Sequence, residues 1–101
     1  EKGMRIGGGA LDPAYEGVIN EFRRNFSNGW EEHGAAFAAF VDGRCVVDVW
    51  GGYADRTCGR VWREDTLSTI FSCTKSIASI CVAMQVEAGN VAYSDLVFMR
   101  G

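Results

Sequence analysis

Two apolar stretches joined by Asp42-Gly43 constrain the fold of this chain more than any other feature of its sequence. Residues 34–41 are apolar and rich in alanine, and residues 44–50 return as a β-branched run. Asp-Gly between two such runs is a strong hairpin signal, because a primed two-residue turn needs positive φ at both central positions. The sequence therefore predicts an antiparallel β-hairpin. Gly51-Gly52 directly after it indicates a bulge or a close backbone approach.

A helix is predicted before the hairpin. Asp12 can cap its first turn, and Pro13 stands where its missing N–H costs nothing. Apolar residues then follow at the spacing of one helical face: Tyr15, Val18, Ile19, Phe22 and Phe26. Asn28-Gly29 ends the pattern. A helix with one apolar face must cover another apolar surface of the fold.

A second helix is predicted over residues 72–87, with Gly89 as its C-terminal cap. It is apolar on nearly every side, which is typical of a helix buried in an interior. Its polar exceptions are therefore informative. At about 100° per residue they share one wedge of the first two turns. These residues are Ser72, Lys75, Ser76 and Ser79.

The wedge contains an S-x-x-K tetrapeptide, Ser72-Cys73-Thr74-Lys75. A serine hydroxyl is a poor nucleophile unless a neighbouring base takes its proton. Lys75 lies one turn further on, and burial favours the neutral amine that such a base requires. The start of the helix adds partial positive charge and unpaired N–H groups where an oxyanion could form. The pattern is compatible with nucleophilic catalysis at Ser72.

A purely structural role explains the same spacing about equally well. Ser72 would then be an ordinary helix cap. Lys75 would lay its aliphatic stem on apolar surface and keep its ammonium in water. Spacing alone leaves both interpretations open.

Composition excludes several classes of function. The 101 residues fit one domain, and a hydrophobic share of 48% is ordinary for a globular protein. A net charge of -3 argues against nucleic-acid binding, which needs a basic stripe. No stretch approaches the roughly 20 apolar residues of a membrane-spanning helix. We therefore expect a soluble chain with no nucleic-acid partner and no membrane span.

The metal-ligating residue types show no ligand spacing. The four cysteines match no zinc or redox motif, so free, buried thiols are expected: Cys45, Cys58, Cys73 and Cys81. His33 is the one histidine and is taken as structural. The sequence indicates no metal and no organic cofactor.

The two ends of the chain are expected to be irregular. Residues 1–10 are polar and rich in glycine, and we interpret them as a loose lead-in; residues 98–101 form a short tail. Residues 1–101 are thus treated as a single segment. The start at Glu1 shows no charged region followed by an apolar core, so no signal peptide is indicated and no compartment follows. Such a start leaves open a processed product or an incomplete sequence.

Three stretches together resemble the start of the β-lactamase-related serine hydrolases: residues 12–26, 42–56 and 64–79. This family includes class C β-lactamases, D-Ala-D-Ala peptidases and β-lactamase-like esterases. The quoted stretches are most similar to the sequences of the esterases. The resemblance implies that Ser72 is acylated and that Lys75 assists proton transfer. It also implies an α+β fold. Its antiparallel sheet opens with the hairpin, is backed by the first helix, and borders an all-helical part that begins with the serine helix.

The same resemblance identifies what this chain lacks. Family members run to several hundred residues. The family's Tyr-x-Asn element has no counterpart, because Tyr93-Ser94-Asp95 ends in the wrong residue, and the later Lys or His before x-Gly is missing. The implied function in a full-length context is hydrolysis of an ester or amide through an acyl-enzyme, with an esterase preferred over a β-lactamase. The alternative is a truncated or degenerate copy, inactive alone, that at most associates with a partner, the missing C-terminal part or a homologue.

Overall fold

The chain divides into two compact units. The computed structural model describes residues 5–100, and within them a first unit ends at Leu67 and a second begins at Ser68. The first unit contains α1 (Glu16–Ser27) and four strands: β1 (Ile6–Ala10), β2 (Gly34–Val41), β3 (Arg44–Asp55) and β4 (Arg60–Val61). The second contains α2 (Thr74–Glu87) and two short 3-10 segments, Phe71–Cys73 and Val97–Arg100. Two helices and an antiparallel sheet confirm the α+β class.

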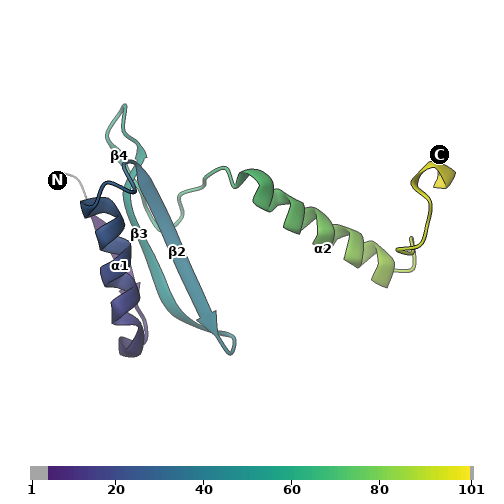
Figure 1. The fold of residues 1–101 in the computed structure, drawn as a ribbon, viewed down its shortest axis with the longest axis horizontal. Helices are drawn as coiled ribbons and strands as arrows, with labels where there is room; N and C mark the ends of the chain where they lie inside the picture. Colours follow the sequence, from purple (N-terminus) through teal and green to yellow (C-terminus); the bar gives the residue numbers. More distant parts are fainter. Residues whose placement is uncertain (1–4, 101) are drawn as a thin grey trace. The chain divides into compact units, whose positions relative to one another are not determined.

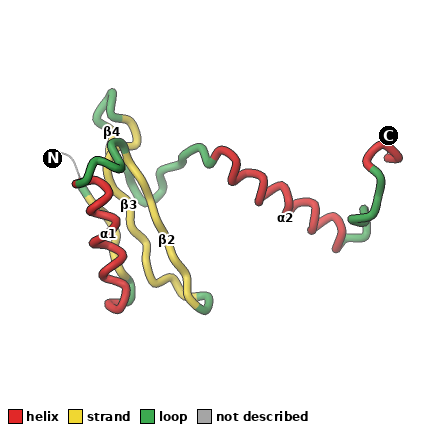
Figure 2. Tube along the Cα trace, in the orientation of Figure 1, coloured by secondary structure: helices red, strands yellow, loops and turns green. Residues whose placement is uncertain are grey.

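The predicted hairpin forms the centre of the first unit. β2 and β3 pair antiparallel from Gly34↔Gly52 to Val41↔Arg44, joined by Asp42 (φ 51°) and Gly43 (φ 77°). Both φ angles are positive, as a primed turn requires. Figure 2 shows the two long strands meeting at this turn. The hairpin prediction is confirmed.

The close backbone approach expected at Gly51-Gly52 is also present. A Cβ atom on Gly52 would lie 2.2 Å from the His33 carbonyl oxygen, and Gly52 has φ +79°. Tyr53 N–H donates to the same oxygen at 2.7 Å. The position therefore needs glycine for its space and for its backbone conformation.

Residues 6–10 differ from the loose lead-in that the sequence suggests. They form β1, which pairs antiparallel with β3 from Ile6↔Gly51 to Ala10↔Val47, giving the order β1-β3-β2. The glycines let the strand approach closely, since a Cβ atom on Gly7 would lie 2.3 Å from Trp50 Nε1. Residues 1–4 of the expected lead-in lie outside the described residues.

The predicted first helix is confirmed, and it packs along the sheet (Figure 1). A short 3-10 turn, Pro13–Tyr15, precedes α1, and the Asp12 carboxylate accepts from Ala14 N–H at 3.0 Å. The apolar side of α1 meets the buried valines of β3 and completes the core. Its members are Ile19, Phe22, Phe26, Val46, Val47 and Val49.

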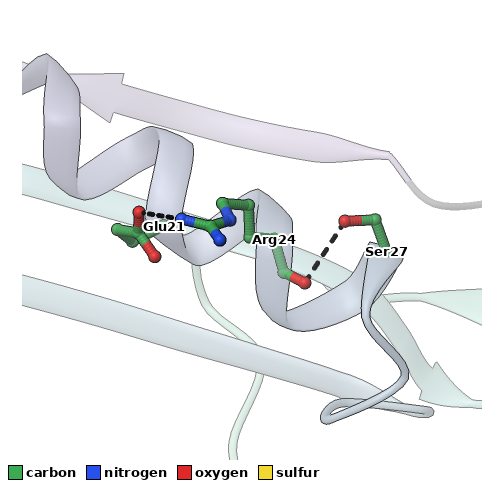
Figure 3. A network of polar contacts seen from close by, with 3 residues as sticks. All are labelled: Glu21, Arg24 and Ser27. Atoms are coloured by element: carbon green, nitrogen blue, oxygen red, sulfur yellow. Dashed lines mark hydrogen bonds and ion pairs between the residues drawn. The ribbon is translucent and has the colours of Figure 1, made fainter.

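The other side of α1 is polar and exposed. Arg24 Nη1 lies 2.7 Å from Glu21 Oε1, and Ser27 Oγ donates to the Arg24 carbonyl at 3.2 Å, as Figure 3 shows. The division between this polar side and the buried aromatic side is the amphipathic pattern that the sequence predicts.

The serine helix forms as predicted, and the described residues leave its apolar sides uncovered. α2 ends before Gly89, which has φ +78°. None of its residues is buried. One helix and a short tail offer too little surface to cover a helix that is apolar on nearly every side. Residues 98–100 of the expected tail belong to the 3-10 segment Val97–Arg100, and residue 101 lies outside the described part.

Candidate active site

The chain enters the serine helix through a constrained turn. Phe71 has φ +49°, which is in the left-handed region of the backbone. This conformation costs a residue with a side chain about 1–2 kcal/mol of conformational energy. A 3-10 turn, Phe71–Cys73, follows, and Cys73 N–H donates to the Ile70 carbonyl at 3.1 Å. Ser72 lies in this turn and Lys75 in the first turn of α2. Sequence reasoning missed the conformation of Phe71, because phenylalanine carries no signal for positive φ.

Ser72 and Lys75 are in direct contact. Lys75 Nζ donates to Ser72 Oγ at 3.0 Å. This distance lies within the range in which a base can exchange a proton with a nucleophile. Transfer from the hydroxyl to Nζ requires the neutral amine, since an ammonium group can only donate. The spacing of three residues thus gives the contact that nucleophilic catalysis needs.

The other serines of the wedge play different parts. Ser79 Oγ donates to the Lys75 carbonyl at 3.1 Å, a bond back along the helix that does not involve Nζ. Ser76 lies one turn after Ser72 on the same exposed helix. Among the four polar residues predicted to share this face, Ser72 and Lys75 are joined by a hydrogen bond between their side chains.

Two N–H groups of the turn form hydrogen bonds within it. Cys73 N–H bonds to the Ile70 carbonyl, and Thr74 N–H bonds to the Phe71 carbonyl. The 3-10 turn before α2 uses these donors internally. Neither the Cys73 N–H nor the Thr74 N–H is therefore free to donate to an oxyanion formed at Ser72.

A shallow hollow lies beside the pair. Its volume is about 450 Å³, and its lining residues are Phe71, Ser72, Thr74, Lys75 and Ala78. All five belong to the second unit. The hydroxyl and the amine thus border a space that is large enough for part of a small molecule.

The cysteines and the other metal-ligating residue types complete the description of the site. Cys45 is half-buried and Cys58, Cys73 and Cys81 are exposed, so the thiols are free as predicted but not buried. Within residues 5–100 no three residues of the types His, Cys, Asp and Glu could hold a metal ion. The described helices are all too short or too polar to cross a membrane.

The carboxyl of Asp55 is surrounded by hydrogen-bond donors from the turn that follows β3. Thr57 Oγ1 donates to Asp55 Oδ1 at 2.5 Å, and Thr57 N–H donates to the same oxygen at 2.9 Å. These two hydrogen bonds, the side-chain one first, lower the pKa of Asp55 below its ordinary value. Asp55 is half-buried, and its carboxylate accepts both hydrogen bonds in the turn after β3.

Residues 22–98, which include the serine turn and α2, match the family model described as Beta-lactamase. The chain belongs to the beta-lactamase family. Within this family it is 35% identical over 85 residues to a protein named esterase/beta-lactamase LipL from Mycobacterium tuberculosis (strain ATCC 25618 / H37Rv). That alignment covers 84% of this chain and 20% of LipL. The family resemblance expected from the three sequence stretches is confirmed, and the chain spans about a fifth of this relative.

Proposed function

We propose that this chain carries the nucleophile of a serine hydrolase that cleaves ester or amide bonds through an acyl-enzyme. One observation supports the proposal most: Lys75 Nζ lies 3.0 Å from Ser72 Oγ in the S-x-x-K motif of a chain that belongs to the beta-lactamase family. The chain spans 20% of LipL, so the activity of a complete protein is part of this proposal. No cofactor is required for the chemistry.

The proposed reaction has two halves. Ser72 Oγ attacks the carbonyl carbon while its proton passes to the neutral Nζ of Lys75. The tetrahedral intermediate then collapses, the bond to the leaving alcohol or amine breaks, and that group takes up the proton. Water attacks the acyl-serine in the second half, which releases the acid and restores the Ser72 hydroxyl. An ester is the preferred substrate, because the sequence is most similar to those of β-lactamase-like esterases.

A second candidate function has its own support. The chain lacks a Tyr-x-Asn and a His/Lys-x-Gly, and no residue of α2 is buried. Catalytic groups act as a unit, so a nucleophile and one lysine retain little of the full acceleration. In this alternative the chain is inactive alone and associates with a homologue or with the rest of a longer domain.

Labelling with a fluorophosphonate, followed by intact mass, tests the catalytic proposal. We expect one adduct on the chain and none on Ser72→Ala. Lys75→Ala should slow labelling by about 100-fold, the lower end of the usual range for a general base. Lys75→Arg should slow it similarly, because arginine keeps the charge but does not accept a proton.

Ser79→Ala is the matched control, because its hydroxyl is on the same helix face but bonds to a backbone carbonyl. It should label at the unmodified rate. A chain that shows helical circular dichroism and remains unlabelled would exclude autonomous catalysis and favour the second candidate. Equal labelling of Ser72→Ala would remove Ser72 as the nucleophile.

A further inference from the structure

Phe71 has three features that the proposed proton transfer does not use. Its backbone is in the left-handed region, at φ +49°. Its side chain is 82% exposed. It also lines the hollow that Ser72 and Lys75 border. The residue before Ser72 is thus a large, exposed aromatic residue that lines the same hollow as Ser72 and Lys75.

The backbone conformation and the exposure are both unfavourable. Glycine adopts positive φ freely, whereas a side chain in that region meets steric resistance. A phenyl ring in water is a further unfavourable contribution, because apolar surface favours burial. The 82% exposure means that packing within the second unit offsets little of either contribution. An apolar group lying on the Phe71 ring would offset the unfavourable exposure of the ring to water.

The hollow offers little to a charged substrate. Lys75 is the one ionisable side chain among its lining residues, and Nζ already contacts Ser72 Oγ. Phe71 and Ala78 give the space an apolar side. No second cation lines it to hold a carboxylate of the bound molecule.

We propose that Phe71 forms the apolar wall of the substrate site, and that Ser72 acts on esters with an uncharged, apolar acyl chain. With the ester carbon at Ser72 Oγ, the acyl chain lies across the Phe71 ring towards Ala78. This inference rests on the proposed function, because it takes Ser72 as the attacking residue. It adds the substrate class and makes Phe71 a specificity-determining residue.

Binding to the chain carrying Ser72→Ala tests the wall without any reaction at the serine. Octanamide serves as an apolar ligand, and 2-(2-methoxyethoxy)acetamide has the same head group with a polar chain of similar length. We expect NMR titration to show tighter binding of octanamide. Adding Phe71→Ala should weaken octanamide binding about tenfold and leave the polar amide unchanged. Phe71→Leu should retain most of the binding.

Two further variants separate the ring from other effects. Phe71→Gly relaxes the backbone but removes the ring, so it should lose as much octanamide binding as Phe71→Ala. Phe98→Ala removes a phenyl ring that is 79% exposed on the same unit but does not line the hollow, and it should bind octanamide unchanged. Circular dichroism verifies that each variant keeps its helix.

The inference is overturned if octanamide does not bind Ser72→Ala, if Phe71→Gly restores binding, or if Phe98→Ala weakens binding as much as Phe71→Ala. Fluorophosphonate labelling of the chain with Ser72 intact tests the nucleophile separately. Phe71-dependent binding without labelling supports the wall and removes the nucleophile. Labelling without Phe71-dependent binding does the reverse.

Discussion

At the scale of single residues, two glycines with nearly the same backbone angle have different surroundings. Gly43 has φ +77° and a Cβ atom there would meet nothing within 4 Å. Gly52 has φ +79°, and its Cβ atom would lie 2.2 Å from the His33 carbonyl oxygen and 3.0 Å from a ring carbon of Phe26. The pair therefore separates the contribution of backbone conformation from that of crowding.

We expect Gly43→Ala to lower the free energy of unfolding by about 1–2 kcal/mol, the contribution of the left-handed backbone. Gly52→Ala should lower it by about 1–3 kcal/mol more, because backbone must move to admit the methyl group. Urea unfolding followed by tryptophan fluorescence measures both, since Trp30, Trp50 and Trp62 all lie in the first unit. Equal losses would contradict the crowding at Gly52.

The Asp55 turn gives a second prediction at this scale. Because the folded pKa of Asp55 is lowered, its contribution to stability is present above the unfolded pKa and is lost as pH falls through the folded pKa. Thr57→Ala removes the largest cause, the hydroxyl donor. An NMR titration should show the Asp55 pKa rising towards its ordinary value in Thr57→Ala. An unchanged pKa would mean that the backbone N–H suffices.

The candidate site shows what single residues reveal in a sequence. Ser72 and Lys75 are recognisable because their spacing fixes their separation once a helix forms. The left-handed backbone of Phe71 cannot be recognised in the sequence, because it arises from the way residues 70–73 turn into the helix. The residue types of Asp42-Gly43 predict positive φ, whereas a phenylalanine does not.

At the scale of elements, the start of α1 gives a third prediction. The Asp12 side chain caps the turn before α1 through Ala14 N–H, and it lies 3.4 Å from Arg44 in an exposed ion pair. Asp12→Ala should cost about 1 kcal/mol of unfolding free energy through the lost cap. Asp12→Asn keeps an acceptor and loses the charge, so it should cost less than half as much.

The same urea titration measures these variants, with Arg44→Ala as the control for the ion pair. An exposed pair contributes about 0–1 kcal/mol, so Arg44→Ala should change little. If Asp12→Asn and Arg44→Ala are each as damaging as Asp12→Ala, the charge and not the cap stabilises this end of α1.

Elements with a clear side-chain pattern could be predicted, and β1 could not. α1 and the hairpin are marked by apolar periodicity, a cap and a turn dipeptide. β1 contains Gly7-Gly8-Gly9, which have no side chains to show alternation. Its conformation comes from pairing with β3 and from the Trp50 ring lying against it. These long-range contacts cannot be predicted from the sequence of residues 6–10 alone.

At the scale of the whole molecule, the two units differ in how they are stabilised. The first has a core of six buried apolar residues, whereas α2 buries none. Isolated helices shorter than about 12–15 residues are marginal in water, and α2 has 14. The apolar composition of α2 predicts that this helix needs cover, and the described residues do not supply it.

Hydrogen exchange measures this difference. We expect the amides of α2 to exchange at least about 100-fold faster than those of β3, because opening α2 exposes no core. The comparison is made within one sample, so concentration and pH are matched. Equal protection in α2 and β3 would show that the serine helix is covered, for example by a second copy of the chain, and a concentration series would then separate that case.

The distance along the chain between β1 and its partner β3 also affects the order in which the sheet forms. β2 and β3 are joined by two residues, so their pairing closes a short loop and can form within microseconds. β1 comes first in the chain, yet its partner β3 begins only at Arg44. We therefore expect the first strand to join last. Substitutions at Asp42-Gly43 should slow folding, whereas substitutions in β1 should mainly speed unfolding.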